Sequence, residues 1–418
     1  MRTDLAETRH APKVRPSRSR DVTRLLIVAS VAPQDALRLI PLAEAARAAG
    51  YEPQIALITN PLGPSQDSAL SRLAGSGLTL FRIDAPADRG VRAAFEQYRA
   101  LSRIVRRAAP QIIHAVGLRA VLVAGAIARL KGLAVVHSPD LISQHLVRGA
   151  ETSWGRRMVL ATGLALVFGH RRAQVHVVTP DDRAALVDAH VLVARRSFLS
   201  RGTGVDLHHF YPRASEPAVD EPTIIALPPP DILGRDALRV VVASARRLKS
   251  QGLAARFVLI GGQDQDRISA DSQKALQAWQ DEGLVEWWEL ADNLAETLRR
   301  VDVFCVPVPA SRGGAMGQLI AAAATGLTLV ATDCGAFRDV IRHDLNGLLV
   351  PFGDTDAFEA ACIKVVKDRA FRAQAAQRSR EIATAEFGLD ASITATLTMY
   401  QAALTPPARM RFFAREEI

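Results

Sequence analysis

The sequence predicts an α/β protein made of two doubly wound domains that face a central cleft. Short apolar runs alternate with helical stretches along almost the whole chain of 418 residues, which is the pattern of parallel sheets with helices on both faces. The apolar runs are continuous rather than interrupted by polar residues, as expected for strands that are covered on both sides. A polar break at 213–223 predicts a linker between two domains of similar size.

The first domain is expected to span 23–212 and to be Rossmann-like. Its predicted strands lie at 25–29, 55–58, 78–83, 112–114, 134–137 and 175–178. Its predicted helices lie between them, at 35–49, 91–108, 118–131 and 182–189. In open sheets of this kind ligands bind beyond the carboxyl ends of the strands, so we expect those ends to face the cleft.

The second domain is expected to span 224–389 and to repeat the same pattern. Its predicted strands lie at 224–227, 257–260, 285–290, 303–306 and 328–332, and its predicted helices at 233–249, 270–282, 293–300 and 317–325. Helix 233–249 is supported by leucine, alanine and valine residues that recur with a period of 3.6. The sequence therefore predicts a second Rossmann-like domain.

The C-terminal part contains clear local signals. Asn346 and Gly347 predict a tight turn. Asp354 is a good N-cap for a helix that begins at Thr355. The alanine- and arginine-rich remainder predicts long helices, and we expect the last one, 390–418, to pack back on the first domain.

The charge balance narrows the choice of partners. The net charge is +9, which favours an anionic partner such as a phosphorylated substrate or an anionic membrane surface. Nucleic acid is not expected, because the basic residues lack interleaved aromatics and match no known module. Three cysteines and ten histidines show no disulfide or metal-ligand spacing, so we expect neither a metal site nor a cofactor.

Two segments raise the question of membrane contact. Residues 1–22 are polar and arginine-rich, which predicts a disordered basic tail rather than a signal peptide, with an acidic-lipid arm as the alternative. Residues 158–169 are apolar, and arginine pairs flank them at 156–157 and 171–172. A span takes about 20 residues, so this segment predicts a buried helix or an interfacial one. We expect a cytoplasmic protein, with peripheral attachment to the inner face of the membrane left open.

A glycine-rich loop is the strongest functional signal. The apolar strand 303–306 runs into Gly313, Gly314 and Gly317, and a helix of small residues follows. Such a loop leaves backbone N–H groups unpaired at the positive end of a helix dipole, which attracts phosphate. The chain lacks a G-x-G-x-x-G run after its first strand, a P-loop and a G-x-S-x-G elbow. NAD enzymes, P-loop NTPases and α/β-hydrolases are therefore disfavoured.

Three segments carry a resemblance to a known family. With GTGVDLHHFYP at 202–212, FVLIGG at 257–262 and the whole of 302–356, the chain resembles the retaining nucleotide-sugar glycosyltransferases of family 4, which have the two-domain GT-B fold. The resemblance implies that the second domain binds the nucleotide diphosphate of a sugar donor. It implies a glycan or lipid-linked acceptor on the first domain, and no metal.

The resemblance also assigns site residues. It places Gly261 and Gly262 near the nucleotide, and Gly313 and Gly314 in the loop under the phosphate and sugar. It makes the backbone at Met316, Gly317 and Gln318 a set of N–H donors. His137 matches a family histidine that faces the donor sugar, with a core or strand-end histidine as the alternative.

Several functional positions depart from the family pattern. The two family glutamates fall on Gly313 and Ala321, the arginine and lysine that clamp the diphosphate fall on Pro228 and Leu233, and paired glycines fall on Pro33 and Gln34. Each charged hydrogen bond is worth roughly 1.5–3 kcal/mol, so the site must be rebuilt or transfer lost. Arg312 beside the loop is the expected catalytic replacement, with Arg235, Arg246, Arg247 and Lys249 as other candidates. Two hypotheses follow: a divergent active transferase that uses His137 and Arg312, or a catalytically inactive binding or scaffold subunit.

Overall fold

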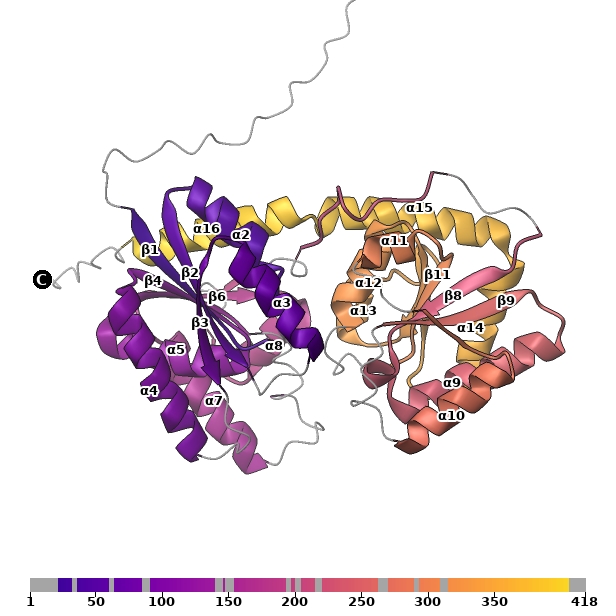
Figure 1. Cartoon of the computed structure of the whole chain (residues 1–418), viewed down its shortest axis with the longest axis horizontal. Helices are drawn as coiled ribbons and strands as arrows, with labels where there is room; N and C mark the ends of the chain where they lie inside the picture. The colour runs from indigo at the N-terminus through magenta and orange to yellow at the C-terminus, as the bar shows by residue number, and fades with distance from the viewer. Residues whose placement is uncertain are drawn as a thin grey trace, which may run out of the picture.

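The structure is a computed structural model with two lobes, each built around one parallel sheet (Figure 1). It describes residues 22–31, 36–59, 64–84, 91–139, 146, 154–192, 197–199, 204–214, 220–261, 270–288, 293–308 and 315–405. The predicted α/β class with two doubly wound units is confirmed.

The first lobe contains a seven-stranded sheet in the order β3-β2-β1-β4-β5-β6-β7. Its strands are β1 (Thr23–Ala29), β2 (Tyr51–Thr59), β3 (Thr79–Asp84), β4 (Ile112–Val116), β5 (Ala134–Ser138), β6 (Ala173–Val177) and β7 (Ser197–Leu199). Its helices are α2 (Leu39–Ala48), α3 (Pro64–Gly75), α4 (Val91–Ala108), α5 (Leu118–Lys131), α7 (Trp154–Phe168) and α8 (Pro180–Asp188). The predicted bounds of α4 and α5 match the structure.

Two hydrophobic clusters hold helices to the two faces of this sheet. Leu101 of α4, Val121 of α5 and Leu164 of α7 pack in the cluster on one face. Ala43 of α2 and Tyr400 of a C-terminal helix pack in the cluster on the other. Helices α4, α5 and α7 therefore form one layer with an outer surface of its own (Figure 1).

The second lobe contains a six-stranded sheet in the order β10-β9-β8-β11-β12-β13. Its strands are β8 (Thr223–Leu227), β9 (Ala255–Ile260), β10 (Glu286–Trp288), β11 (Val303–Val306), β12 (Thr328–Thr332) and β13 (Gly347–Val350). Its helices are α9 (Pro230–Ser250), α10 (Ala270–Asp281), α11 (Leu294–Leu298), α12 (Ala315–Ala324), α13 (Gly335–Arg338), α14 (Thr355–Lys367) and α15 (Arg369–Glu386). One continuous core fills the space between this sheet and its helices.

The structure differs from the expected elements in two informative places. Gly234 has φ 72°, which breaks α9 after a first short turn, so the regular helix begins close to the predicted 233. Strands β7 and β13 are not among the predicted strands; β13 begins at Gly347, which is the second residue of the predicted turn. Asp354 caps α14 as expected, because its side chain accepts a hydrogen bond from the N–H of Ala357.

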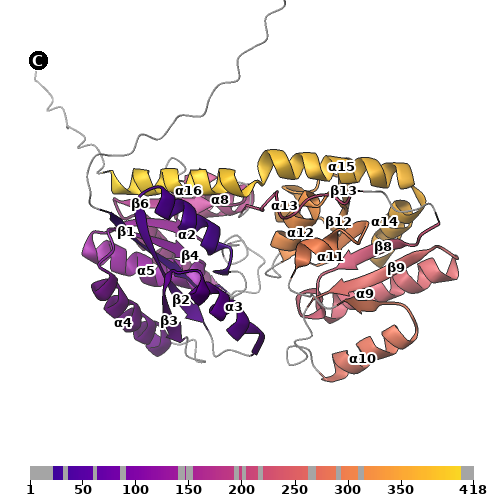
Figure 2. The same cartoon turned by 45° about the horizontal axis from the view of Figure 1, so that its top comes forward.

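The chain passes between the lobes twice, and the two passages lie side by side. Helix α15 packs on the second lobe, and α16 (Leu389–Leu404) packs on β5 and β6 of the first (Figures 1 and 2). Val205 and Gly388 form a β-bridge at the crossing. Arg380 donates hydrogen bonds to the carbonyls of Phe210 and Ala324, each at 2.6 Å. These contacts tie both passages to the second lobe.

Candidate functional site

The first turn of α12 is the part of the predicted phosphate site that the structure describes. The helix begins at Ala315, so Met316, Gly317 and Gln318 lie in its first turn and are half-buried. The first four N–H groups of a helix have no intrahelical partner and stand at the positive end of its dipole. This turn can therefore hold an anion without a charged side chain of its own. Arg312, Gly313, Gly314 and Gly262 lie outside the described residues.

An arginine of the first lobe lies against this turn. Arg38 directly precedes α2, and its side chain is exposed. A β-carbon at Gly317 would come within 2.6 Å of both Nη atoms of Arg38, so the guanidinium lies directly on the Gly317 backbone. Sequence reasoning missed Arg38, because no motif surrounds it and its partner is almost three hundred residues away. The structure adds this cation to the backbone donors of α12.

A second pair of residues joins the lobes. Asp181 stands in the first turn of α8, where Thr179 is the N-cap and accepts a hydrogen bond from the N–H of Asp182. The Asp181 carboxylate contacts the position that a β-carbon on Gly335 would occupy. Gly335 is the first residue of α13, so the carboxylate faces a helix start. We call the place where Arg38 meets Gly317 and Asp181 meets Gly335 the interlobe junction.

Arg338 carries positive charge at the same junction. Its guanidinium donates to both carboxylate oxygens of Asp333, at 2.6 and 2.9 Å. This hydrogen bonding lowers the pKa of Asp333 and raises the pKa of Arg338, and the Asp181 charge also raises the latter. The second lobe therefore presents an ion pair beside the contact with Asp181.

Gly261 is held in place by close packing at the end of β9. A β-carbon there would overlap the ring of Pro229, which stands just before α9. Its carbonyl accepts a hydrogen bond from Trp287 Nε1 at 3.1 Å, and its N–H donates to the Trp288 carbonyl at 3.2 Å. These contacts explain why glycine stands here; the predicted proximity of Gly261 to the nucleotide stays a prediction.

The structure places His137 inside the first lobe. The residue has no exposed surface, and its ring lies between Gly125 of α5 and Val167 and Phe168 of α7. Neither ring nitrogen has a hydrogen-bond partner among the described residues. Burial, followed by the nearby His170, lowers the pKa of His137 to about 3, which keeps the ring neutral. This position favours the alternative interpretation of His137 as a histidine of the core. Its catalytic role stays a prediction.

A buried polar chain lies across the neighbouring strands. His114 Nδ1 is 2.8 Å from the hydroxyl of Tyr400 in α16, and His114 Nε2 is 2.8 Å from Ser138 Oγ. Ser138 Oγ is also 3.2 Å from His176 Nδ1. Burial lowers the pKa of His114 to about 3, with His176 and His137 adding to the shift, and lowers that of His176 to about 4. This chain ties the C-terminal helix to the first lobe.

Three of the positions that depart from the family pattern are buried, whereas Gly313, Pro33 and Gln34 lie outside the described residues. Leu233 and Ala321 are 2% and 4% exposed, and Pro228 is buried as well. Of the other arginine and lysine candidates, Arg246 pairs with Glu282 at 2.8 Å and Arg247 with Glu359 at 3.2 Å. Both pairs lie near the far end of α9. Arg235 is exposed just beyond the Gly234 break and keeps its place as a candidate.

Across the described ranges, no group of three or more histidine, cysteine, aspartate or glutamate side chains is placed to hold a metal ion. In the same ranges no helix is both long and apolar enough to cross a bilayer.

Two parallel-sheet lobes with a helix start at their junction define a protein of GT-B architecture, and comparison with solved structures agrees. Sucrose-phosphate synthase from Thermosynechococcus elongatus is similar with a TM-score of 0.69 and 20% identity, over 90% of this chain and 98% of that one. HepE of Anabaena in complex with UDP and glucose is similar with a TM-score of 0.68 and 14% identity, over 91% and 99% of the two chains. At these identities the likeness establishes the fold.

The sequence families identify the chain more closely. Residues 38–202 match the family described as glycosyl transferase 4-like domain, and residues 231–368 match glycosyl transferases group 1. The first lobe therefore carries a glycosyl transferase 4-like domain, and the second lobe carries a glycosyl transferases group 1 domain. A phosphatidyl-myo-inositol mannosyltransferase of Mycolicibacterium smegmatis is 28% identical over 149 residues, which are 35% of this chain. The match spans only 37% of that relative.

Proposed function

We propose that this protein transfers a sugar from a nucleotide-sugar donor to a glycan or lipid-linked acceptor, with retention of configuration and without a metal. The observation that carries the proposal is the Arg38 guanidinium on the Gly317 backbone, at the first turn of α12. The family assignment gives the class of reaction, and this contact supplies a cation where the leaving group would be bound.

The chemistry of sugar transfer explains the need for this arrangement. The leaving nucleoside diphosphate gains negative charge as its bond to the sugar breaks, and fixed donors aimed at that charge lower the barrier. The N–H groups of Met316, Gly317 and Gln318 supply one set of donors. Arg38 supplies a second from the opposite lobe. A charged hydrogen bond is worth roughly 1.5–3 kcal/mol, so Arg38 would contribute about 10- to 150-fold.

The relatives suggest the kinds of substrate. HepE has been solved with UDP and glucose, which supports a sugar nucleotide as the donor. The mycobacterial relative is named for mannose transfer to a phosphatidyl-inositol, which supports a lipid-linked acceptor. We propose that the donor binds the second lobe near Gly261 and α12, and the acceptor the first. A cytoplasmic location fits these substrates.

A second candidate function also has an observation in its favour. The positions where the resemblance expects a glutamate and a lysine are the buried Ala321 and Leu233, whose side chains carry neither a charge nor a hydrogen-bonding group. A protein that binds a donor or a partner without transferring a sugar would tolerate these residues. The two candidates differ in turnover, and donor binding alone is compatible with both.

A thermal-shift screen with UDP-, GDP-, ADP- and TDP-sugars tests the proposal. A ligand at 100 times its dissociation constant stabilises the folded state by about 2.7 kcal/mol. We expect one donor to raise the melting temperature and to release its nucleoside diphosphate when acceptor extracts are added. A shift without product favours the inactive binding subunit. The absence of a shift with every donor contradicts a donor site.

A further inference from the structure

Helix α7 presents an apolar face to solvent. Trp154, Met158, Val159 and Leu166 are 72%, 49%, 75% and 53% exposed. No charged residue occurs from 158 to 169, so this stretch lacks the charged residues that the outer face of a surface helix normally carries. Exposed apolar patches of this kind mark surfaces that bind a partner or a membrane.

The neighbouring helices extend this face. Figure 1 shows α4, α5 and α7 side by side on one face of the first lobe. Leu130, near the end of α5, is 74% exposed, and Phe95 of α4 is 57% exposed. The guanidinium carbon of Arg99 lies 5.8 Å from the centre of the Phe95 ring. Apolar and cationic groups are therefore mixed on one surface.

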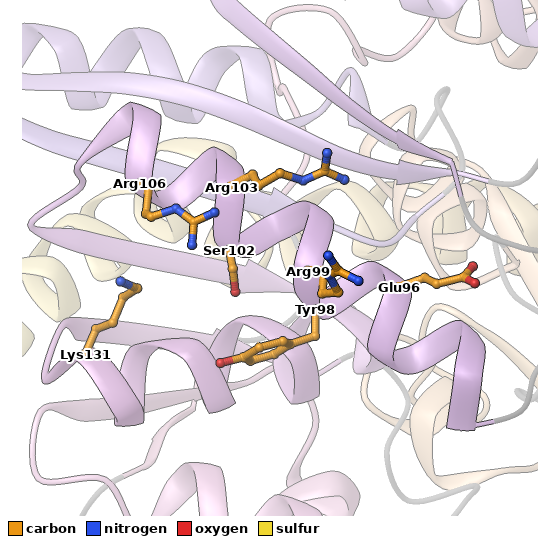
Figure 3. Close-up of a pocket in the computed structure, with 7 residues that line it drawn as sticks. All are labelled: Glu96, Tyr98, Arg99, Ser102, Arg103, Arg106 and Lys131. Carbon is orange, nitrogen blue, oxygen red and sulfur yellow. The ribbon is translucent and has the colours of Figure 1, made fainter.

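A basic cavity lies between α4 and α5 on the same surface. Its volume is about 660 Å³, and it is lined by Glu96, Tyr98, Arg99, Ser102, Arg103, Arg106 and Lys131. Tyr98 and Ser102 point from α4 toward α5, and Lys131 extends into the cavity from the end of α5 (Figure 3). Its one carboxylate, on Glu96, is paired with Arg92 at 3.1 Å. The remaining charges favour a phosphate group.

We propose that this surface, which we call the α4–α7 face, docks the protein on an anionic phospholipid bilayer. The apolar side chains of α7 would lie at the boundary between headgroups and acyl chains, with Trp154 at the interface. Arg99, Arg103, Arg106 and Lys131 would bind lipid phosphates. The basic residues of this face complement the negative charge of the bilayer. A second copy of this chain would bring the same cations to the contact, and the two sets would repel each other. The inference does not depend on the donor site.

Vesicle sedimentation with the full-length protein tests the inference. The vesicles contain phosphatidylcholine alone or phosphatidylcholine mixed with phosphatidylglycerol. We expect strong binding to the anionic vesicles, weak binding to the neutral ones, and loss of binding as salt rises.

Two double variants then localise the contact. Val159→Ser with Leu166→Ser should weaken binding to anionic vesicles at least about tenfold, because both side chains are exposed and would lose their apolar insertion. Arg103→Gln with Arg106→Gln should weaken it by about tenfold or more. Phe352→Ser, at a side chain that is 60% exposed on the second lobe, is the matched control and should bind like the wild type.

Three results would overturn the inference. One is a wild-type protein that does not sediment with anionic vesicles. Another is unchanged binding of both double variants at unchanged melting temperature, which would assign the binding to another part of the chain, such as residues 1–22. The third is a wild-type dimer in light scattering that the serine variant converts to a monomer, which would assign the face to a second copy.

Discussion

The guanidinium of Arg38 lies on the backbone of Gly317, across the junction of the two lobes. The two residues are 279 positions apart in a chain of 418. The contact is possible because residue 317 has no side chain: a β-carbon there would stand 2.6 Å from both Nη atoms. The first lobe therefore supplies the positive charge of Arg38 to the start of α12 only when the two lobes lie this close together.

Arg38→Gln should weaken donor binding and slow transfer. The change removes the positive charge that the first lobe brings to α12, and we expect a loss of about 10- to 150-fold in kcat/KM. Titration of the donor and assay of product release measure the two effects. Arg72→Gln removes another exposed arginine of the first lobe, near the end of α3, and should change neither the donor affinity nor the rate of transfer. Equal behaviour of the two variants would remove Arg38 from the site.

Gly317→Ala should imitate the loss of Arg38. The new methyl group would displace the guanidinium, which can move because it is the far end of a flexible side chain. Stability should therefore change little, while donor affinity falls as it does in Arg38→Gln. A double-mutant cycle checks the physical link, because the two losses should not add. Additive losses would mean that the two residues act separately.

Acid should destabilise the first lobe through its buried histidines. The pKa values of His114 and His137 are lowered to about 3 and that of His176 to about 4, chiefly by burial. The folded state keeps these rings neutral while the unfolded chain takes up protons below pH 6.5, so stability is greatest above that value. It should fall as pH drops from 6.5 toward 4, by about 1.4 kcal/mol per pH unit for each histidine.

The substitution His137→Leu isolates the contribution of this one histidine to the pH dependence of stability. Leucine cannot take up a proton and suits the apolar surroundings of Val167 and Phe168. The slope of unfolding free energy against pH should flatten by about 1.4 kcal/mol per unit. Urea melts between pH 4 and pH 7 measure the slope in the wild type and in the leucine variant, and an unchanged slope in the variant would refute the assignment.

Asn346→Ala should destabilise the second lobe. The side chain is fully buried; its oxygen accepts from the N–H of Arg342 at 2.7 Å, and its nitrogen donates to the carbonyl of Val340 at 3.0 Å. Removing it leaves both partners unpaired, at a cost of about 1–3 kcal/mol each. Chemical denaturation measures the loss. Asp344→Ala, at an exposed residue two positions earlier, should lower the free energy of unfolding far less. It removes an exposed ion pair with Lys364, and such pairs contribute little.

The Asn346-Gly347 pair, within the segment 302–356 that carries the resemblance, is thus explained by folding rather than by chemistry. Gly347 lies against the backbone of Leu329 in β12, where a β-carbon would overlap the carbonyl. Asn346 fixes the preceding turn, and β13 starts at once. The resemblance rests in part on residues that hold the scaffold, so it indicates the fold even where functional positions differ.

The site was less accessible to sequence reasoning than the fold. The start of α12 could be located from glycine and small residues, because the signal is local. The burial of His137 could not be predicted from the sequence, because Gly125 of α5 leaves space for the ring and α7 covers it. The pairing of Arg246 with Glu282 and of Arg247 with Glu359 could not be predicted either, because each glutamate lies on a separate helix or turn far along the chain.

The sequence by itself determined the two parallel sheets, the helices that cover them and the position of the glycine-rich turn, because apolar periodicity and turn chemistry act over short stretches of chain. The tertiary structure alone decided which charged groups come together and what they contact: Arg38 with α12, Asp181 with α13, and the basic residues of α4 with Lys131 of α5. These partners lie on separate elements, and only the docking of helices and lobes fixes the distances on which their electrostatics depends.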